Sequence, residues 1–257
     1  MPDISLRPCA ELAAGVPVDR QPAWVLVHGA WHGGWCWDRV AARLRALGHS
    51  VSAPTLTGLA ERAALRSRSV TLATHVQDIV DQVRGLGRAD VVLVGHSYGG
   101  FPATVAAAQL GGLVRHLVLL DAFLPVNGEK LLDHAPALIA AYAASAQADE
   151  RWHIPPLPSA MFGVAETDRA WVDALLTPQP VNTYFEPACL PAGSGRVRRS
   201  YIRCLRAPGD LLARSLARVH ADPAWTYAEL DAEHDAMLSA PGPLVRLLLQ
   251  LQGCSAH

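Results

Sequence analysis

The chain has 257 residues, of which 51% are hydrophobic, and a formal net charge of −1. A chain of this length and apolar content can bury a large core, and α/β chains of this size are commonly single units. The balanced charge gives no basic stripe, so nucleic acid is not expected as a partner. No uninterrupted apolar stretch is long enough to cross a membrane, so a membrane partner is not expected either.

Cysteine usage and the first residues indicate the compartment. The cysteines are odd in number, scattered, and never form a C-x-x-C pair; they are Cys9, Cys36, Cys189, Cys204 and Cys254. Neither a disulfide framework nor a structural zinc site is therefore expected. The first twenty residues carry acids, prolines and an arginine and lack the continuous apolar core of a secretory signal. We expect a soluble protein in a reducing, cytoplasmic compartment.

The hydrophobic pattern of the first half alternates between strands and helices after a lead-in over residues 1–21. Apolar runs predict strands over 23–28, 51–56, 89–94 and 114–121. Helical periodicity predicts helices over 37–47, 71–86 and 101–110. Fully apolar strands that alternate with amphipathic helices are typical of a parallel sheet covered on both faces.

The alternation stops at Ala122 and resumes after about Gly195. The intervening segment predicts an alanine-rich helix over 135–148, a proline-rich turn over 154–158 and a helix around 168–176. Strands over 200–205 and 225–230 and helices over 211–219 and 243–251 follow it. We therefore predict an α/β fold with a mostly parallel, doubly wound sheet. Its core is formed by residues 1–121 and 196–257, and residues 122–195 form a helical cap inserted after the strand that ends at Asp121.

The run VVLVGHSYGG over residues 91–100 carries the strongest chemical signal. Four apolar residues lead into Gly-x-Ser-x-Gly, and an alanine-rich helix follows. The glycines are needed because the serine lies in a strained turn where side chains two positions away would collide. This strand–turn–helix context predicts that Ser97 is an exposed nucleophile at the positive end of a helix.

A serine hydroxyl needs a histidine base, which is oriented in turn by an acid. His234 follows the last predicted strand and precedes the last helix, so it lies at the same sheet edge as Ser97. His96 must point away from Ser97, and we expect it to pack or hydrogen-bond locally. The oxyanion hole needs two backbone N–H donors, which we assign to Tyr98 and to Ala30.

The histidines of the first glycine-rich loop could be misread as ligands of a metal. His28, His32 and Cys36 lie in this loop without helical spacing, so no metal site is predicted there. No metal or organic cofactor is needed for the chemistry of a serine nucleophile and a histidine base.

Several motifs together resemble the α/β-hydrolase superfamily. They are VLVHGAWHGGWCWDRV, GHSYGG, the strand YIRC at Tyr201–Cys204, and AEHDAML around His234. Within the superfamily they look like the plant methyl esterase and hydroxynitrile lyase group and its bacterial carboxylesterase relatives, including pyrethroid hydrolases. The resemblance runs from about Ala23 to Leu251. It implies an α/β-hydrolase fold and ester hydrolysis.

Two positions favour an esterase over a lyase by this resemblance. The lyases have a threonine after the strand-end histidine, where this chain has Gly29, and a bare glycine leaves space for an acyl carbonyl. They also place a lysine shortly after the catalytic histidine, where this chain reads Asp235-Ala236-Met237. Lyase chemistry is therefore the minor alternative.

The acid of the triad departs from the plant pattern. When the strand Tyr201–Cys204 is aligned with its counterpart in the plant enzymes, Ala207 falls where those enzymes have an aspartate. Asp210 lies three residues further on and could substitute after a loop shift. We favour Asp121, because an aspartate that ends an apolar strand at the active edge needs a partner, and His234 is the natural one.

The expected substrate is a small to medium hydrophobic ester, hydrolysed through an acyl-enzyme. The predicted pocket is lined by Gly29, Trp31, Trp152, Leu157, Met161 and Phe162, and an apolar roof suits acyl or aromatic groups. Two alternatives stay open: a hydroxynitrile-type carbon–carbon lyase and a low-turnover receptor for a small ligand. An exposed apolar cap face could support a homodimer.

Overall fold

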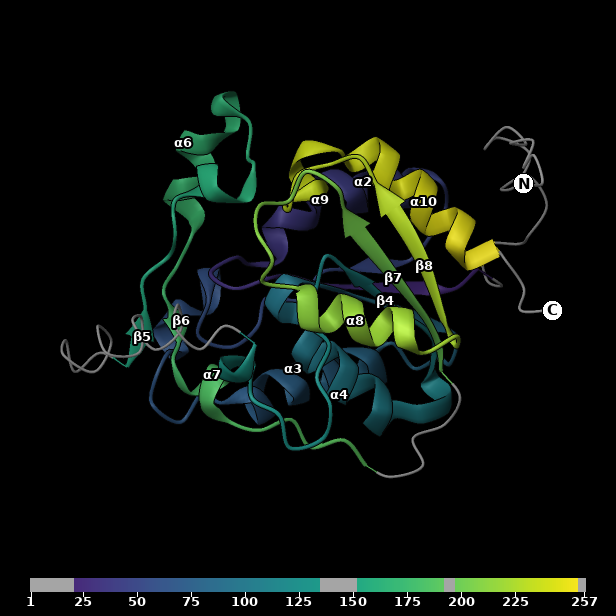
Figure 1. Ribbon diagram of the computed structural model, residues 1–257, viewed down its shortest axis with the longest axis horizontal. Helices are drawn as coiled ribbons and strands as arrows, with labels where there is room; N and C mark the ends of the chain where they lie inside the picture. Colours follow the sequence, from purple (N-terminus) through teal and green to yellow (C-terminus); the bar gives the residue numbers. More distant parts are fainter. Residues whose placement is uncertain (1–20, 135–151, 192–196, 254–257) are drawn as a thin grey trace.

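The computed structural model describes residues 21–134, 152–191 and 197–253. Its core is a six-stranded sheet with the order β2-β1-β3-β4-β7-β8, in which every neighbouring pair is parallel. The strands are β1 (Ala23–Val27), β2 (Val51–Ser52), β3 (Val91–His96), β4 (Val114–Leu120), β7 (Arg198–Cys204) and β8 (Trp225–Leu230). Because all strands run the same way, the loops that follow them meet at one edge of the sheet (Figure 1).

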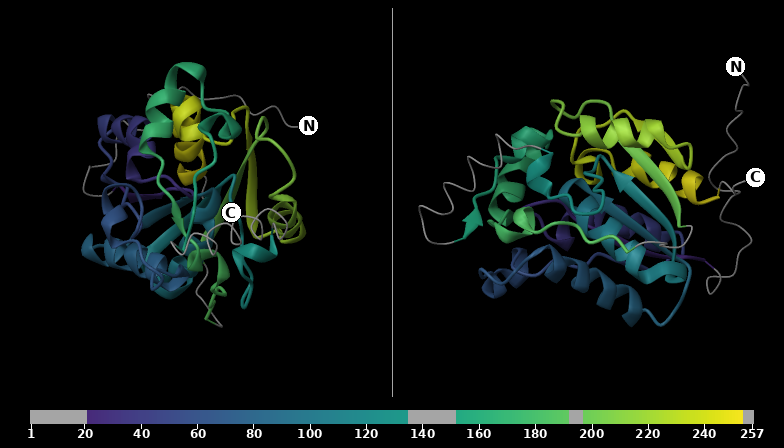
Figure 2. Two further views of the ribbon diagram at one scale, coloured as in Figure 1. Left: turned by 90° about the vertical axis from the view of Figure 1, so that its left-hand side faces the viewer. Right: turned by 60° about the horizontal axis from the view of Figure 1, so that its bottom comes forward.

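Helices cover both faces of the sheet. The helices α2 (Asp38–Ala46), α9 (Ala236–Ser239) and α10 (Pro241–Gly253) lie on one face. The other face is covered by α3 (Leu72–Gly85) and α4 (Gly100–Leu110), and α8 (Ala213–Ala221) packs beside β8 (Figures 1 and 2). Short 3₁₀ turns complete the core: η2 (Gly34–Trp37), η3 (Ala60–Leu65), η4 (Ser97–Gly99) and η5 (Gly111–Leu113). The predicted doubly wound α/β fold is therefore confirmed.

The strand predicted over 51–56 is much shorter in the structure, where β2 ends at Ser52. Pro54 has no N–H to donate to a ladder, so it ends the pairing of this edge strand. The backbone after Ser52 hydrogen-bonds to side chains instead of to a neighbouring strand. The Leu56 N–H, for example, donates to His28 Nε2 at 3.0 Å. Of the rest of this run, Thr55 and Leu56 are buried without being part of a strand.

The segment between β4 and β7 carries helices and a small sheet of its own. It contains α6 (Glu166–Leu175), α7 (Asn182–Phe185), and the 3₁₀ turns η6 (Leu131–Asp133) and η7 (Ser159–Phe162). A two-stranded antiparallel sheet joins β5 (His153–Ile154) to β6 (Gln179–Pro180), which the sequence did not predict because two-residue strands show no periodicity. The helix predicted around 168–176 is confirmed as α6, and the one predicted over 135–148 lies outside the described residues.

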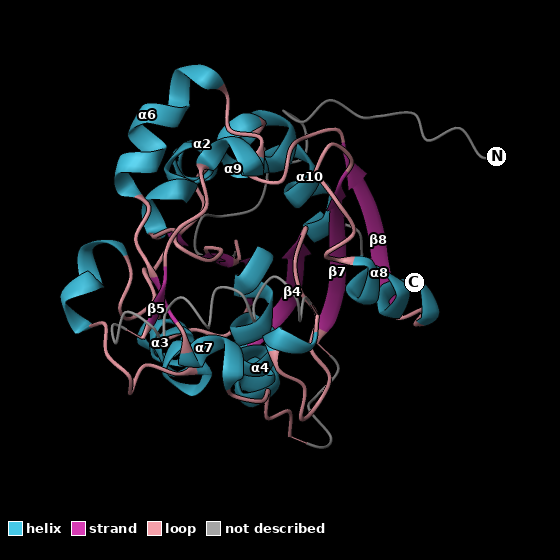
Figure 3. Ribbon diagram, turned by 60° about the vertical axis from the view of Figure 1, so that its left-hand side comes forward, coloured by secondary structure: helices cyan, strands magenta, loops and turns pink. Residues whose placement is uncertain are grey.

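This segment lies at the edge where the parallel strands end. Figure 3 shows α6 next to α2 and α9, with β5 and α7 further along the same side. Arg39 of α2 donates two hydrogen bonds to the Asp168 carboxylate of α6, at 2.6 and 2.9 Å. The insertion is thereby fastened to the core, and its role as a separate cap over residues 122–195 stays a prediction. Among the described residues, no helix is long and apolar enough to span a bilayer.

Candidate active site

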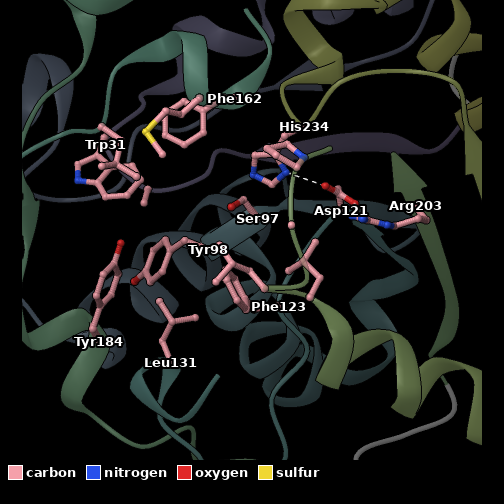
Figure 4. A pocket seen from close by; sticks show the side chains of 17 residues that line it. Trp31, Ser97, Tyr98, Asp121, Phe123, Leu131, Phe162, Tyr184, Arg203 and His234 are labelled. Atoms are coloured by element: carbon pink, nitrogen blue, oxygen red, sulfur yellow. Dashed lines mark hydrogen bonds and ion pairs between the residues drawn. The ribbon is translucent and has the colours of Figure 1, made fainter. Parts of the chain in front are cut away.

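Ser97 lies in the tight turn between β3 and α4. Its φ of +51° places it in the left-handed region that residues other than glycine seldom adopt. A Cβ atom on Gly95 would lie 2.8 Å from the Gly99 carbonyl oxygen, and one on Gly99 would lie 2.5 Å from the His28 carbonyl oxygen. The turn can therefore close only with glycine at both positions, and the half-buried Ser97 side chain faces the cavity shown in Figure 4.

His234 and Asp121 meet at the same edge of the sheet. His234 follows β8 and Asp121 follows β4, and the His234 Nδ1 atom lies 2.7 Å from Asp121 Oδ2 (Figure 4). A carboxylate oxygen can only accept, so this bond fixes a proton on Nδ1 and leaves Nε2 with a lone pair. The Asp121 side chain is fully buried, whereas His234 is 15% exposed and lines the cavity together with Ser97.

Arg203 holds the other side of the Asp121 carboxylate. Its Nη1 atom donates to Asp121 Oδ1 at 2.6 Å, and the Cys204 N–H donates to the same oxygen at 3.1 Å. Burial alone would raise the pKa of Asp121, but the hydrogen bond from His234 and the positive charge of Arg203 lower it overall. The carboxylate therefore stays charged in the interior. Sequence reasoning missed Arg203, whose only signal is its position where β7 passes the end of β4.

The alternative acid lies elsewhere. Asp210 is exposed in the loop before α8, where its carbonyl oxygen accepts from the Ala213 N–H. Within the described part of the chain, Asp210 has no hydrogen bond or ion pair to His234. The structure thus brings together Ser97, His234 and Asp121, and leaves Asp210 outside.

Ala30 and Tyr98 both line the cavity, as an oxyanion hole requires. The Gly29 carbonyl accepts a hydrogen bond from His28 Nδ1 at 2.7 Å. Because the C=O and N–H of one trans peptide point in opposite directions, this bond also fixes the direction of the Ala30 N–H. Gly29 itself does not line the cavity. A Cβ there would lie 3.0 Å from His96 Nδ1 and 3.1 Å from Ser97 Cβ, so packing beneath the serine explains this glycine, rather than space for an acyl group.

The cavity has a volume of about 260 Å³ and a mainly apolar lining. Four of the residues predicted to line it do so: Trp31, Leu157, Met161 and Phe162. Trp152 does not, because its ring lies against the Arg68 guanidinium, 4.0 Å from the ring centroid. The lining also includes residues that the sequence analysis did not name: Phe123, Leu131, Tyr184, Arg203, Pro208, Gly209, Leu211 and Leu212.

Serine, histidine and aspartate at the ends of parallel strands, beside an apolar cavity, define a hydrolase of the α/β type. The chain matches the alpha/beta hydrolase family over residues 24–247, and it belongs to that family. The resemblance inferred from the sequence motifs is thus confirmed.

Individual relatives share this architecture along almost their whole length. The chain is 35% identical over 238 residues to the carbendazim hydrolyzing esterase of Nocardioides sp. (strain SG-4G), which covers 89% of this chain and 98% of that protein. It is 28% identical over 257 residues to methylesterase 7 of Arabidopsis thaliana, with coverages of 91% and 97%. The structure of an extracellular alpha/beta-hydrolase from a Paenibacillus species has the same fold, with a TM-score of 0.78 at 23% identity over 90% of this chain and 98% of that one.

The turn around Ser97 makes a prediction about stability. We expect Gly99→Ala to lower the free energy of unfolding by about 1–3 kcal/mol, because the added methyl group would press on the His28 carbonyl. Gly85→Ala at the end of α3 is the control, since its methyl group would meet nothing within 4 Å. Urea unfolding of both variants measures the difference. Equal stabilities would show that the turn has room for a side chain.

Buried histidines make the stability depend on pH. Burial lowers the pKa of His28, His96 and His116 from 6.5 to about 3, so the unfolded chain binds protons that the folded chain does not. The free energy of unfolding therefore rises with pH between these values, by about 1 kcal/mol per pH unit for each histidine. His116→Gln should reduce the slope of the free energy of unfolding against pH by about the contribution of one histidine. Urea unfolding between pH 5 and pH 6.5 measures this slope. An unchanged slope would mean that His116 is protonated in the folded protein.

Proposed function

We propose that the protein is a serine carboxylesterase that acts on small to medium hydrophobic esters. One observation carries the proposal: the His234–Asp121 hydrogen bond of 2.7 Å lies beside Ser97, which faces the same apolar cavity. The family assignment and the esterases among its relatives support ester hydrolysis as the reaction.

In the proposed reaction, His234 Nε2 takes the proton of Ser97 Oγ as this oxygen attacks the ester carbonyl carbon. Asp121 holds the imidazole in the required tautomer and stabilises the imidazolium that forms. The backbone N–H groups of Ala30 and Tyr98 hold the oxyanion of the tetrahedral intermediate. The alcohol leaves with the proton from His234, and a water molecule then hydrolyses the acyl-enzyme with His234 as the base.

The form of the cavity supports hydrophobic substrates. Trp31, Phe123 and Phe162 surround it, and its volume of about 260 Å³ suits an aryl or short acyl group. The relatives are a carbendazim hydrolyzing esterase and a methylesterase by name, which makes methyl esters and methyl carbamates of aromatic acids and amines suitable first substrates. None of the described residues that line the cavity is a lysine, so no observation favours the lyase alternative.

The cytoplasmic location and the homodimer stay predictions. Free thiols support a reducing compartment: Cys36 and Cys204 are buried and unbridged among the described residues. Exposed apolar side chains around the cap, Met161 at 53% and Trp171 at 37%, are the features that support a dimer.

We predict the following outcome for hydrolysis of a chain-length series of p-nitrophenyl esters. Ser97→Ala should abolish turnover, and Asp121→Asn should lower kcat by about 10⁴-fold, because the histidine loses the partner that fixes its tautomer. Asp210→Asn is the matched control, with kcat expected within about threefold of the wild type, since an exposed side chain with no hydrogen bond or ion pair to His234 among the described residues contributes little to the chemistry.

Circular dichroism of each variant confirms that it is folded. Loss of turnover in Asp210→Asn with retention in Asp121→Asn would move the acid to Asp210. A wild type that is inert toward every ester, including methyl carbamates, would contradict the carboxylesterase proposal.

A further inference from the structure

A second buried histidine–carboxylate pair lies directly behind His234. The His32 Nε2 atom is 3.2 Å from Asp235 Oδ2, and the two side chains are 3% and 0% exposed. Asp235 is the residue after His234, and His32 lies two residues after Ala30. The pair therefore joins the loop that carries the proposed base to the loop that carries one proposed oxyanion donor.

The other nitrogen of His32 makes a hydrogen bond to the backbone. Its Nδ1 atom lies 2.8 Å from the Ala30 carbonyl oxygen. A carbonyl oxygen only accepts, so Nδ1 must donate. His32 thus bridges the Ala30 backbone and the Asp235 side chain, and its ring is stacked on Trp35 and packed edge-on against Phe162.

His96 holds the same loop from the side of the serine. Its Nε2 atom lies 3.0 Å from the His234 carbonyl oxygen, and the two rings are 4.6 Å apart between centroids. The Asp235 carboxylate lies 3.8 Å from the same His96 nitrogen. The base loop is therefore fixed through its backbone by His96 and through the next side chain by His32.

The sheet itself supplies no connection between these two loops. They follow β1 and β8, and β3, β4 and β7 lie between these two strands. No strand ladder runs from one loop to the other, so their separation depends on the packing of η2 against α9 and on contacts between side chains. His32 and Asp235 make one such contact.

We propose that His32 and Asp235 are positioning residues for ester hydrolysis, which fix the distance between the Ala30 oxyanion donor and the His234 base. This inference rests on the carboxylesterase proposed above. Neither side chain lines the cavity, so both act through the groups that they hold.

Stability alone does not account for such a pair. Burial would lower the pKa of His32 and raise that of Asp235, but their mutual attraction reverses both shifts and favours the charged form of each. Other ionisable groups that interact with the carboxylate include His96, His234 and the buried Cys36 thiol. Replacing a buried ion pair with apolar side chains of similar volume is often neutral or stabilising, and in some proteins the pair serves instead to specify a geometry. Catalysis is sensitive to that geometry, because a displacement of about 1 Å costs about 100-fold in rate.

The test compares Asp235→Ala with Asp235→Asn. Alanine removes the connection, so kcat should fall by about 100-fold while KM changes by less than about threefold. Asparagine can donate its amide N–H to Nε2 of a neutral His32, which still donates Nδ1 to Ala30, so this variant should recover most of kcat. His116→Ala is the control: it also removes a buried hydrogen bond, to Ser200, but remote from the site. It should lower Tm and leave kcat unchanged.

Phenylboronic acid gives a second readout, because its tetrahedral adduct with Ser97 uses the oxyanion hole. We expect Asp235→Ala to weaken boronate inhibition by a factor similar to its loss of kcat, and to leave the inhibition constant of the product acid unchanged. If this variant does not fold, His32→Phe keeps the ring between Trp35 and Phe162, removes the ion pair with Asp235 and the hydrogen bond to Ala30, and should show the same losses.

The outcomes separate the two proposals. A wild type that neither hydrolyses esters nor binds the boronate contradicts the proposed function. A wild type that does both, with Asp235→Ala within twofold of it in kcat and boronate affinity, contradicts only the positioning role. Equal losses in Asp235→Asn and Asp235→Ala would also contradict it, because the charge and not the connection would then matter.

Discussion

The hydrogen bond between Asp121 and His234 is the interaction on which the rest of the site depends. It requires a charged carboxylate in the interior, where an unpaired charge costs several kcal/mol. Arg203 and the Cys204 N–H hold the second oxygen, so both oxygens have partners from β7 or from the loop after β8. Asp121, at the end of β4, thus connects β7 to the loop after β8 on one side of Ser97.

Three of the six described non-glycine residues with positive φ lie at the same edge. Trp31, Ser97 and Asp121 follow the neighbouring strands β1, β3 and β4, and all three have positive φ, at 66°, 51° and 41°. Strained residues persist only where the surroundings hold them, and they gather at functional sites. The insertion helps to hold Trp31, because Gln179 accepts from its N–H and the Ile154 carbonyl accepts from its indole. The small sheet β5–β6 therefore helps to hold the loop after β1 that carries Trp31.

Local sequence patterns were enough to predict the sheet, Ser97, and the two side chains that the structure places beside it. Each signal lies within a few residues: a glycine pair around a serine, or a polar residue that ends an apolar strand. The remaining parts of the site depend on contacts between distant segments. Arg203 reaches Asp121 only through the register of β7 on β4, and Tyr184 reaches the cavity through the fold of the insertion. Trp152 is predicted to line the cavity but does not. The sequence carries no local signal for the direction in which an aromatic ring of the insertion points.

The most direct test of this account is a proton NMR spectrum of the protein with isotope-labelled histidine, recorded in the far-downfield region. A proton on His234 Nδ1 that is hydrogen-bonded to a buried carboxylate should give a downfield resonance in the wild type. It should persist in Ser97→Ala and Asp210→Asn and disappear in Asp121→Asn. A resonance that survives unchanged in folded Asp121→Asn would show that His234 has a different partner, and would contradict the account.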